Sequence, residues 1–145
     1  MFQNVTKRGK NFLGYGIFIV LLAIGIFIAF SKMNSLANYS AFTTGKIFEV
    51  TTFSKNPEVF VRYRYVVGQK QYDAIHSLPG TFKSEHFQPL YKLLLNKSFP
   101  VAYDSTDCDN SEMLLTQQQY KMFKVPRPDS LKSVFRLYDN IIKEQ

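Results

Sequence analysis

Hydrophobic and polar positions divide the chain into two parts with different patterns. Residues 12–30, FLGYGIFIVLLAIGIFIAF, carry no charged residue, proline, asparagine or glutamine. At about 1.5 Å of rise per residue, this run forms a helix of about 28 Å, close to the hydrocarbon thickness of a bilayer. The pattern therefore predicts a transmembrane helix. A cleaved signal peptide is the alternative, but its apolar region is usually shorter, about 7–15 residues.

Beyond residue 43 the pattern becomes that of β-strands. Residues 46–53, KIFEVTTF, are rich in β-branched and aromatic side chains. In residues 58–67, EVFVRYRYVV, valines and tyrosines alternate with charged and other residues, as on the two faces of a strand. Gly68 and Gln69 can form the two-residue loop of a hairpin, whose second strand is residues 70–77. Residues 31–43, rich in serine, asparagine and threonine, predict a linker.

The last third of the chain mixes helical and strand-like patterns. Leucines at helical spacing predict a short helix from about Pro89 to Asn96. Apolar residues spaced three and four apart predict an amphipathic helix over residues 130–143. Short strands are predicted on either side of an acidic segment, at residues 99–103 and 113–115. Runs of strands followed by a helix predict an α+β or mainly β fold, with one small antiparallel β domain at residues 44–145.

The distribution of basic residues predicts the topology of the span. Lys7, Arg8 and Lys10 precede it within residues 1–11, whereas Lys32 is the only basic residue in the predicted linker. Because basic residues are retained on the cytoplasmic side, we expect a cytoplasmic N-terminus, an extracytoplasmic C-terminal domain and a location in the cell (inner) membrane.

Two small residues give the span a possible helix-packing face. Gly25 and Ala29 lie four residues apart, which is a spacing that allows close approach of a second helix. A homo-oligomer through Gly25 and Ala29 is therefore one possible assembly.

Charge and cysteine content narrow the classes of partner. The net charge is +7, but 15 basic and 11 acidic residues beyond residue 30 leave only +4 there. This mild bias suits a domain near anionic lipid headgroups better than a nucleic-acid-binding protein. The single cysteine forms no internal disulfide, so the sequence leaves the redox compartment open.

The acidic segment raises the question of a metal site. It places Asp104, Asp107, Asp109 and Glu112 between two apolar runs. An EF-hand loop needs oxygen ligands at positions 1, 3, 5 and 12 and glycine at position 6. Counting from Asp107, position 5 is a serine and position 6 is a glutamate, so the match fails. The segment predicts a solvated turn, with a weak cation site as the alternative.

Other residues with possible chemistry give no catalytic pattern. A nucleophilic role for Cys108 needs His76 or His86 beside it, and nearby carboxylates disfavour a thiolate. Two histidines without a second pair of ligands are not a zinc motif, and we expect His76, at the end of a strand, and His86, in a polar stretch, to be surface residues. We therefore predict no enzyme, no cofactor and no metal requirement.

The strand at residues 58–67 carries the best candidate for a binding surface. Arginines and tyrosines alternate in it, so they lie on opposite faces and do not make a nucleic-acid stacking platform. Phe60, Arg62, Arg64 and Val66 share one face, which combines apolar groups and arginine as protein-contact patches do.

Three motifs follow the span in order: TTGKIFEV, VRYRYVVGQKQYDA and LLLNKSFPVAYDSTDCDNSEMLL. Together with the span they resemble the bacterial membrane-anchored family called domain of unknown function 3592. The likeness covers about half the chain and is carried by Gly45–Ile47, Tyr63–Tyr72 and Val101–Asp104. It implies a membrane-anchored β-rich domain and no catalytic residues. The chain departs from the pattern in the turn STDCDN and in its added C-terminal helix.

These observations predict a single-pass membrane protein that acts by binding. The expected role is a protein-interaction or accessory subunit of the bacterial cell envelope, with another membrane or envelope protein as partner. The alternative is an immunity-type or regulatory protein that acts on a toxin or a membrane enzyme.

Overall fold

The computed structural model describes residues 5–52, 58–78, 82 and 84–143. The chain divides into two compact units, Met1–Ser35 and Leu36–Gln145. The end of the first predicted strand, Phe53, lies outside the described residues.

The first unit consists of an apolar helix. Helix α1 runs from Val5 to Tyr39 and is therefore longer than the predicted span of residues 12–30. Its part from Tyr15 to Tyr39 is long and apolar enough to cross a membrane, and within the described residues it is the one helix that meets this criterion. A signal sequence near the N-terminus meets the same criterion of length and composition.

Regular structure fills residues 31–43, which the sequence predicts as a linker. Helix α1 continues to Tyr39, and strand β1 begins at the next residue, Ser40. Leu36 is already buried, and the Tyr39 carbonyl accepts a hydrogen bond of 3.0 Å from the Ser105 amide. The serine and asparagine content indicated a loop, but burial and strand pairing dominate over this local preference.

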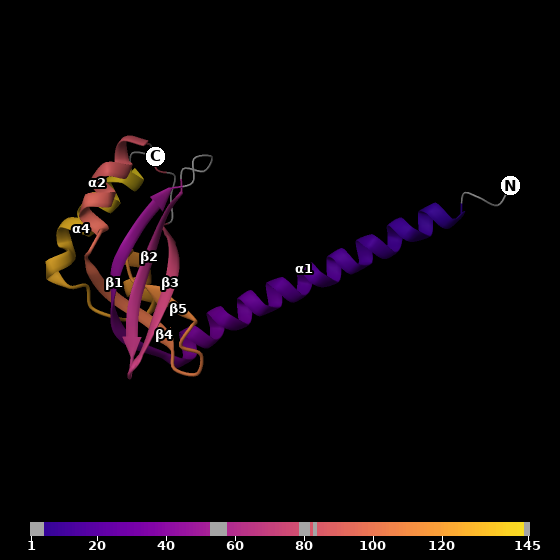
Figure 1. Cartoon of the computed structure of the whole chain (residues 1–145), viewed down its shortest axis with the longest axis horizontal. Helices are drawn as coiled ribbons and strands as arrows, with labels where there is room; N and C mark the ends of the chain where they lie inside the picture. The colour runs from indigo at the N-terminus through magenta and orange to yellow at the C-terminus, as the bar shows by residue number, and fades with distance from the viewer. Residues whose placement is uncertain (1–4, 53–57, 79–81, 83, 144–145) are drawn as a thin grey trace. The chain divides into compact units, whose positions relative to one another are not determined.

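The second unit is built on a curled antiparallel sheet (Figure 1). Its strand order is β3-β2-β1-β4-β5, so β3 and β5 are the two edge strands. The sheet curls until these two edges come into contact. The strands are β1 (Ser40–Thr52), β2 (Val59–Val67), β3 (Lys70–Leu78), β4 (Ser98–Asp104) and β5 (Ser111–Met113).

Strand β2 confirms the faces predicted from its alternation. Tyr63 and Tyr65 are buried on the inner face, whereas Arg62, Arg64 and Val66 are exposed on the outer face. The β2–β3 hairpin is also confirmed, because Val67 pairs with Lys70 around Gly68 and Gln69. Gly68 has φ +61°, a value that glycine adopts without strain at the first central position of a two-residue loop.

Gly45 allows β1 to pass close to the core. A Cβ at this position would lie 2.6 Å from a methyl group of Val101 on β4 and 3.1 Å from the Met113 side chain on β5. Any larger residue would therefore push β1 away from its neighbours.

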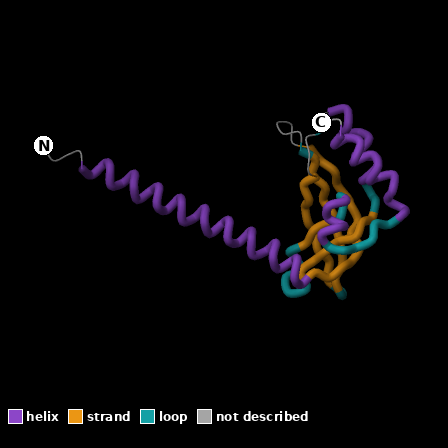
Figure 2. Tube along the Cα trace, turned by 180° about the vertical axis from the view of Figure 1, so that it is seen from behind, coloured by secondary structure: helices purple, strands orange, loops and turns teal. Residues whose placement is uncertain are grey.

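Helices α2 and α4 lie side by side against the sheet (Figures 1 and 2). Helix α2 runs from Ser84 to Leu94, so the predicted start at Pro89 was more than one turn too late. The apolar spacing extends back to Phe87, which packs against the core with Leu90 and Leu94, and Pro89 lies inside the helix. The predicted helix over residues 130–143 is confirmed as the short helix η1 (Asp129–Leu131) followed by α4 (Lys132–Lys143).

The core lies between the inner face of the sheet and these helices. Its strand residues include Ile47, Val50, Val59, Val61, Tyr63, Tyr65, Phe99, Val101 and Met113, and its helical residues include Leu90, Leu94, Leu131, Val134, Phe135 and Tyr138. The fold is therefore α+β, as the order of the elements predicted.

Candidate protein-contact surface

The two outward-facing arginines of β2 are each held by a carboxylate from a neighbouring strand. Arg64 donates from Nε to Asp73 Oδ1 at 2.7 Å and from Nη2 to Asp73 Oδ2 at 2.8 Å. Arg62 lies 3.4 Å from Glu49 on β1. Both pairs join residues directly opposite each other in the sheet. The charges of the arginines are therefore balanced on the surface itself.

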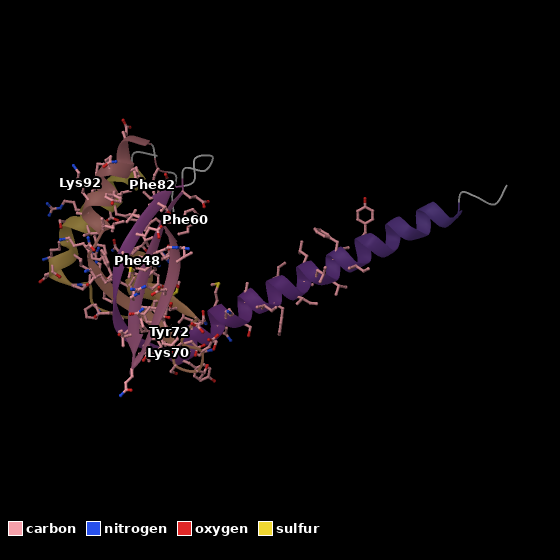
Figure 3. The ribbon with its side chains drawn as sticks, in the orientation of Figure 1. Phe48, Phe60, Lys70, Tyr72, Phe82 and Lys92 are labelled. Carbon is pink, nitrogen blue, oxygen red and sulfur yellow. The ribbon has the colours of Figure 1, made fainter. Side chains whose placement is uncertain are left out.

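A β-bulge adds an aromatic side chain to this face. The pairing of β1 with β2 shifts register between Ile47 and Glu49, so that Phe48 is the additional residue. The guanidinium carbon of Arg64 lies 5.1 Å from the centre of the Phe48 ring, within the range of a cation–π contact. Figure 3 shows Phe48 near the middle of the sheet and Phe60 closer to its upper end.

The apolar residues of this face are well exposed. The exposed fractions are 39% for Phe48, 50% for Val66 and 59% for Ile75. A shallow hollow of about 260 Å³ lies between Phe48, Arg62, Asp73 and Ile75. We call the residues of this side the outer sheet face: Phe48, Glu49, Phe60, Arg62, Arg64, Val66, Asp73 and Ile75.

The Arg64–Asp73 pair sets the local electrostatics. The hydrogen bonds from Arg64 hold the pKa of the Asp73 carboxyl below its ordinary value, and the same hydrogen bonds raise the pKa of Arg64. Both groups stay charged at neutral pH because each stabilises the ionised form of the other. The outer sheet face is thus a set of exposed apolar groups between fixed ion pairs.

Sequence reasoning found half of this surface. The period of two in β2 predicted Phe60, Arg62, Arg64 and Val66. Ile75 and Asp73 follow from the same alternation in β3, once the hairpin fixes the register. Phe48 had no signal in the alternation, because the bulge interrupts it.

The acidic segment forms the β4–β5 turn. Asp104 is 1% exposed, and its Oδ1 accepts hydrogen bonds from the Thr106 amide at 2.8 Å and the Thr106 hydroxyl at 2.7 Å. The Asp104 amide donates to the Asn110 carbonyl at 2.9 Å, which closes the turn. This local bonding of an aspartate to its own turn is the role predicted for the segment, and Asp107 and Asp109 are exposed as in a solvated turn, whereas Asp104 is buried.

The described residues contain no group of three or more histidine, cysteine, aspartate or glutamate side chains that could hold a metal ion. Asp104, Asp107, Asp109 and Glu112 are all among them. The weak cation site considered from the sequence therefore has no ligand cluster in the described structure.

Two tyrosines of β2 fix the acidic turn from the inner face. The Tyr63 hydroxyl lies 3.0 Å from Ser111 Oγ, and the Tyr65 hydroxyl donates to the Cys108 carbonyl. Cys108 is half-buried and has no disulfide. Its carbonyl contributes to the turn.

Of the two histidine side chains, the structure describes that of His76. His76 points to the inner side of β3 and is half-buried, whereas sequence reasoning placed it at the surface. The side chain of His86 lies outside the described residues. Gly25 and Ala29 are both exposed on α1, and a Cβ on Gly25 would meet no atom within 4 Å.

A second surface hollow, of about 520 Å³, follows the exposed side of α4. Its lining combines charges of both signs, including Arg127, Arg136 and Asp139. Lys132 and Asp129 form an exposed ion pair of 2.9 Å in it. This mixture of opposite charges selects no ligand, so the outer sheet face is the stronger candidate.

No family model, curated protein or solved structure matches the chain. The likeness to domain of unknown function 3592 therefore stays a prediction, and the function is argued from the described residues alone.

Proposed function

We propose that the chain is a single-pass membrane protein of the bacterial cell envelope whose C-terminal domain binds another membrane or envelope protein through the outer sheet face. The N-terminus is cytoplasmic and the domain extracytoplasmic in this proposal. Supporting it are the length and composition of Tyr15–Tyr39 and the distribution of basic residues around the span.

The observation that carries the binding role is the exposure of Phe48, Val66 and Ile75 together on one face. Single exposed apolar side chains are common on protein surfaces, but a group of them on one face of a small domain marks a contact site. The ion pairs of Arg62 and Arg64 form a polar part of the surface beside them, a composition typical of protein interfaces.

The ion pairs also bear on the chemistry of the partner. Because Glu49 and Asp73 already balance the two arginines, an acidic partner would gain little from them. The complementary surface is therefore apolar at its centre, opposite Phe48 and Ile75. Binding is then expected to depend weakly on salt concentration, in contrast to binding through unbalanced charges.

Site-specific photo-crosslinking in the cells that produce the full chain tests the proposal. A photoreactive residue at Ile75 is compared with one at Met122, which is 55% exposed but lies at the end of helix α3 (Gln117–Met122) instead of on the sheet. We expect a membrane-protein adduct from position 75 and none from position 122. Equal adducts at both positions, or none at either, would contradict the proposal.

Charge insertion gives a second measurement. The partner identified by crosslinking is then co-purified with the chain without a photoreactive residue. The variant Ile75→Glu should lower the amount of co-purified partner by at least about tenfold, as loss of a central apolar contact does. Met122→Glu should leave recovery unchanged, and both variants should keep the thermal stability of the parent. The identity of the partner separates the alternatives: a toxin or a membrane enzyme would favour the immunity-type or regulatory role.

Topology is tested separately. Resistance to alkaline extraction and labelling of a tag on Gln145 from outside the inner membrane are the expected results. A tag that becomes accessible only after the inner membrane is opened would overturn the orientation.

A further inference from the structure

A small polar cluster connects the two sheet edges. His76 comes from β3, Glu112 from β5, and Gln119 from α3 (Gln117–Met122). The Gln119 Nε2 atom lies 3.3 Å from His76 Nε2 and donates to Glu112 Oε1 at 2.6 Å. Gln119 thus bridges the seam between β3 and β5 and is itself only 7% exposed.

The orientation of the Gln119 amide is fixed by the backbone. Its Oε1 accepts hydrogen bonds from the Leu115 amide at 2.9 Å and from the Thr116 amide at 2.8 Å. A backbone amide can only donate, so the atom that faces it must be the oxygen. The NH₂ group must therefore face His76 and Glu112.

This orientation determines the state of the histidine. The NH₂ group has two hydrogens; one is donated to Glu112 and the other points to His76 Nε2. A nitrogen that receives a donor must carry a lone pair, so Nε2 bears no proton and the neutral ring carries its hydrogen on Nδ1. In a protonated ring, the N–H at Nε2 would face the N–H of the Gln119 side chain, and no hydrogen bond could form between them.

We propose that His76 is a pH-sensitive latch, whose neutral ring holds β3 to Gln119 across the seam and whose protonation releases this hold. Release removes the side-chain hydrogen bond that connects β3 to Gln119 of α3 and, through Gln119, to Glu112 of β5. The device needs no ligand and does not rest on the proposed binding role.

The charged group that faces the ring is Glu112 of β5. From α3 the ring meets the neutral Gln119, from β2 its strand partner is Val61, and Ala74 and Leu78 are its neighbours on the inner face of β3. Burial of the ring lowers the pKa of His76 below its ordinary value and outweighs the charge of Glu112, which raises it. Burial and loss of the acceptor thus both penalise protonation.

The tautomer can be measured directly on the unmodified full chain in detergent micelles. Two-dimensional ¹⁵N–¹H spectra of the imidazole ring show which nitrogen carries the proton. We expect a protonated Nδ1 and a bare Nε2 for His76 at neutral pH. A proton on Nε2 at neutral pH would overturn the proposal without any substitution.

Hydrogen exchange measures the release. The amides of Leu115 and Thr116 report on the cluster because both donate to Gln119. After correction for intrinsic exchange, we expect their protection to fall as pH decreases below the ordinary histidine pKa, by up to about tenfold per pH unit, the limit for one proton.

Two matched variants identify the group responsible. In His76→Gln a neutral amide oxygen can accept from Gln119 at every pH, so the protection should no longer depend on pH in this range. His86→Gln removes the only other histidine of the chain and should behave as the parent. Parent-like pH dependence in His76→Gln would refute the latch. Rising protection in acid would also refute it, because it would show that protonated His76 pairs directly with Glu112.

Discussion

Arg64 and Asp73 face each other across the β2–β3 pair and use both ends of the guanidinium edge, with donor–acceptor distances of 2.7 and 2.8 Å. Such a two-point contact fixes both side chains on the outer sheet face. It also ties the edge strand of the sheet to its neighbour from the solvent side.

The first prediction concerns the titration of Asp73. Hydrogen bonds from Arg64 lower its pKa in the folded protein, so the pair contributes stability above the ordinary carboxyl pKa and loses it as pH falls through the lowered value. In Arg64→Met, the Asp73 pKa should rise toward its ordinary value, as measured by carboxyl ¹³C shifts. Arg62→Met should raise it less, because Arg62 acts on Asp73 only through a weaker charge interaction. Equal rises in the two variants would contradict this assignment.

The second prediction compares two tyrosines with different hydroxyl environments. Tyr63 is fully buried and its hydroxyl bonds to Ser111, whereas the buried Tyr120 hydroxyl has no hydrogen-bond partner among the described residues. Tyr63→Phe should cost about 1 kcal/mol of unfolding free energy. Tyr120→Phe should be neutral or stabilising, because it removes a buried polar group without a partner. Denaturant unfolding measures both, and a larger loss in Tyr120→Phe would contradict the prediction.

The third prediction concerns alkaline pH. Burial raises the pKa of Tyr120 to about 12, whereas the phenol of an unfolded chain ionises near its model-peptide value of 10.0. The unfolded state therefore loses its proton first, and stability should fall as pH rises through this interval. Tyr120→Phe should lose less stability than the parent over the same interval. An unchanged pH profile in this variant would show that Tyr120 does not contribute.

The fourth prediction tests the close approach at Gly45. Gly45→Ala places a methyl group 2.6 Å from Val101, so we expect a loss of about 1–3 kcal/mol through displacement of β1. Gly68→Asn is the control, since no atom lies within 4 Å of a Cβ there and asparagine tolerates positive φ. Thermal unfolding followed by circular dichroism distinguishes the two variants. Equal stability of Gly45→Ala and the parent would show that β1 can move without cost.

The fifth prediction tests the start of α3. Thr116 and Gln119 form a capping box. The backbone amide of Gln119 donates to Thr116 Oγ1 at 3.3 Å, and the backbone amide of Thr116 donates to the Gln119 side chain. Thr116→Ala should cost about 1 kcal/mol, and Thr116→Ser should restore most of it. Failure of serine to restore stability would place the effect on packing of the threonine methyl group.

The strands were predictable because their periods were clean. Alternation in residues 58–67 gave the inner and outer faces of β2, and Gly68 gave the hairpin. The same local reading missed α3, although Thr116 and Gln119 have the spacing of a capping box directly after an apolar run. The helix is only six residues long, so its apolar period was too short to recognise.

Other features depend on contacts between distant residues. The position of His76 at the end of a strand predicts a surface residue. The curl of the sheet, which the sequence does not show, brings Glu112 and Gln119 to it. The polar composition of residues 31–43 predicts a linker, yet Leu36 is buried and the Tyr39 carbonyl accepts a hydrogen bond from the distant Ser105 amide. Sequence periodicity reports the face of an element but not its partner.

The bulge at Phe48 acts as a one-residue insertion that preserves the phase of everything after it. If the same residues formed a regular strand without the bulge, Glu49 would turn toward the tyrosines of the interior and Val50 toward solvent. With it, an aromatic ring and a carboxylate stand next to each other on the same side, each against a different arginine. Deletion of Phe48 would therefore give a regular β1–β2 pairing that keeps Glu49 opposite Arg62 and Val50 in the core, and only the aromatic ring of the surface would be lost.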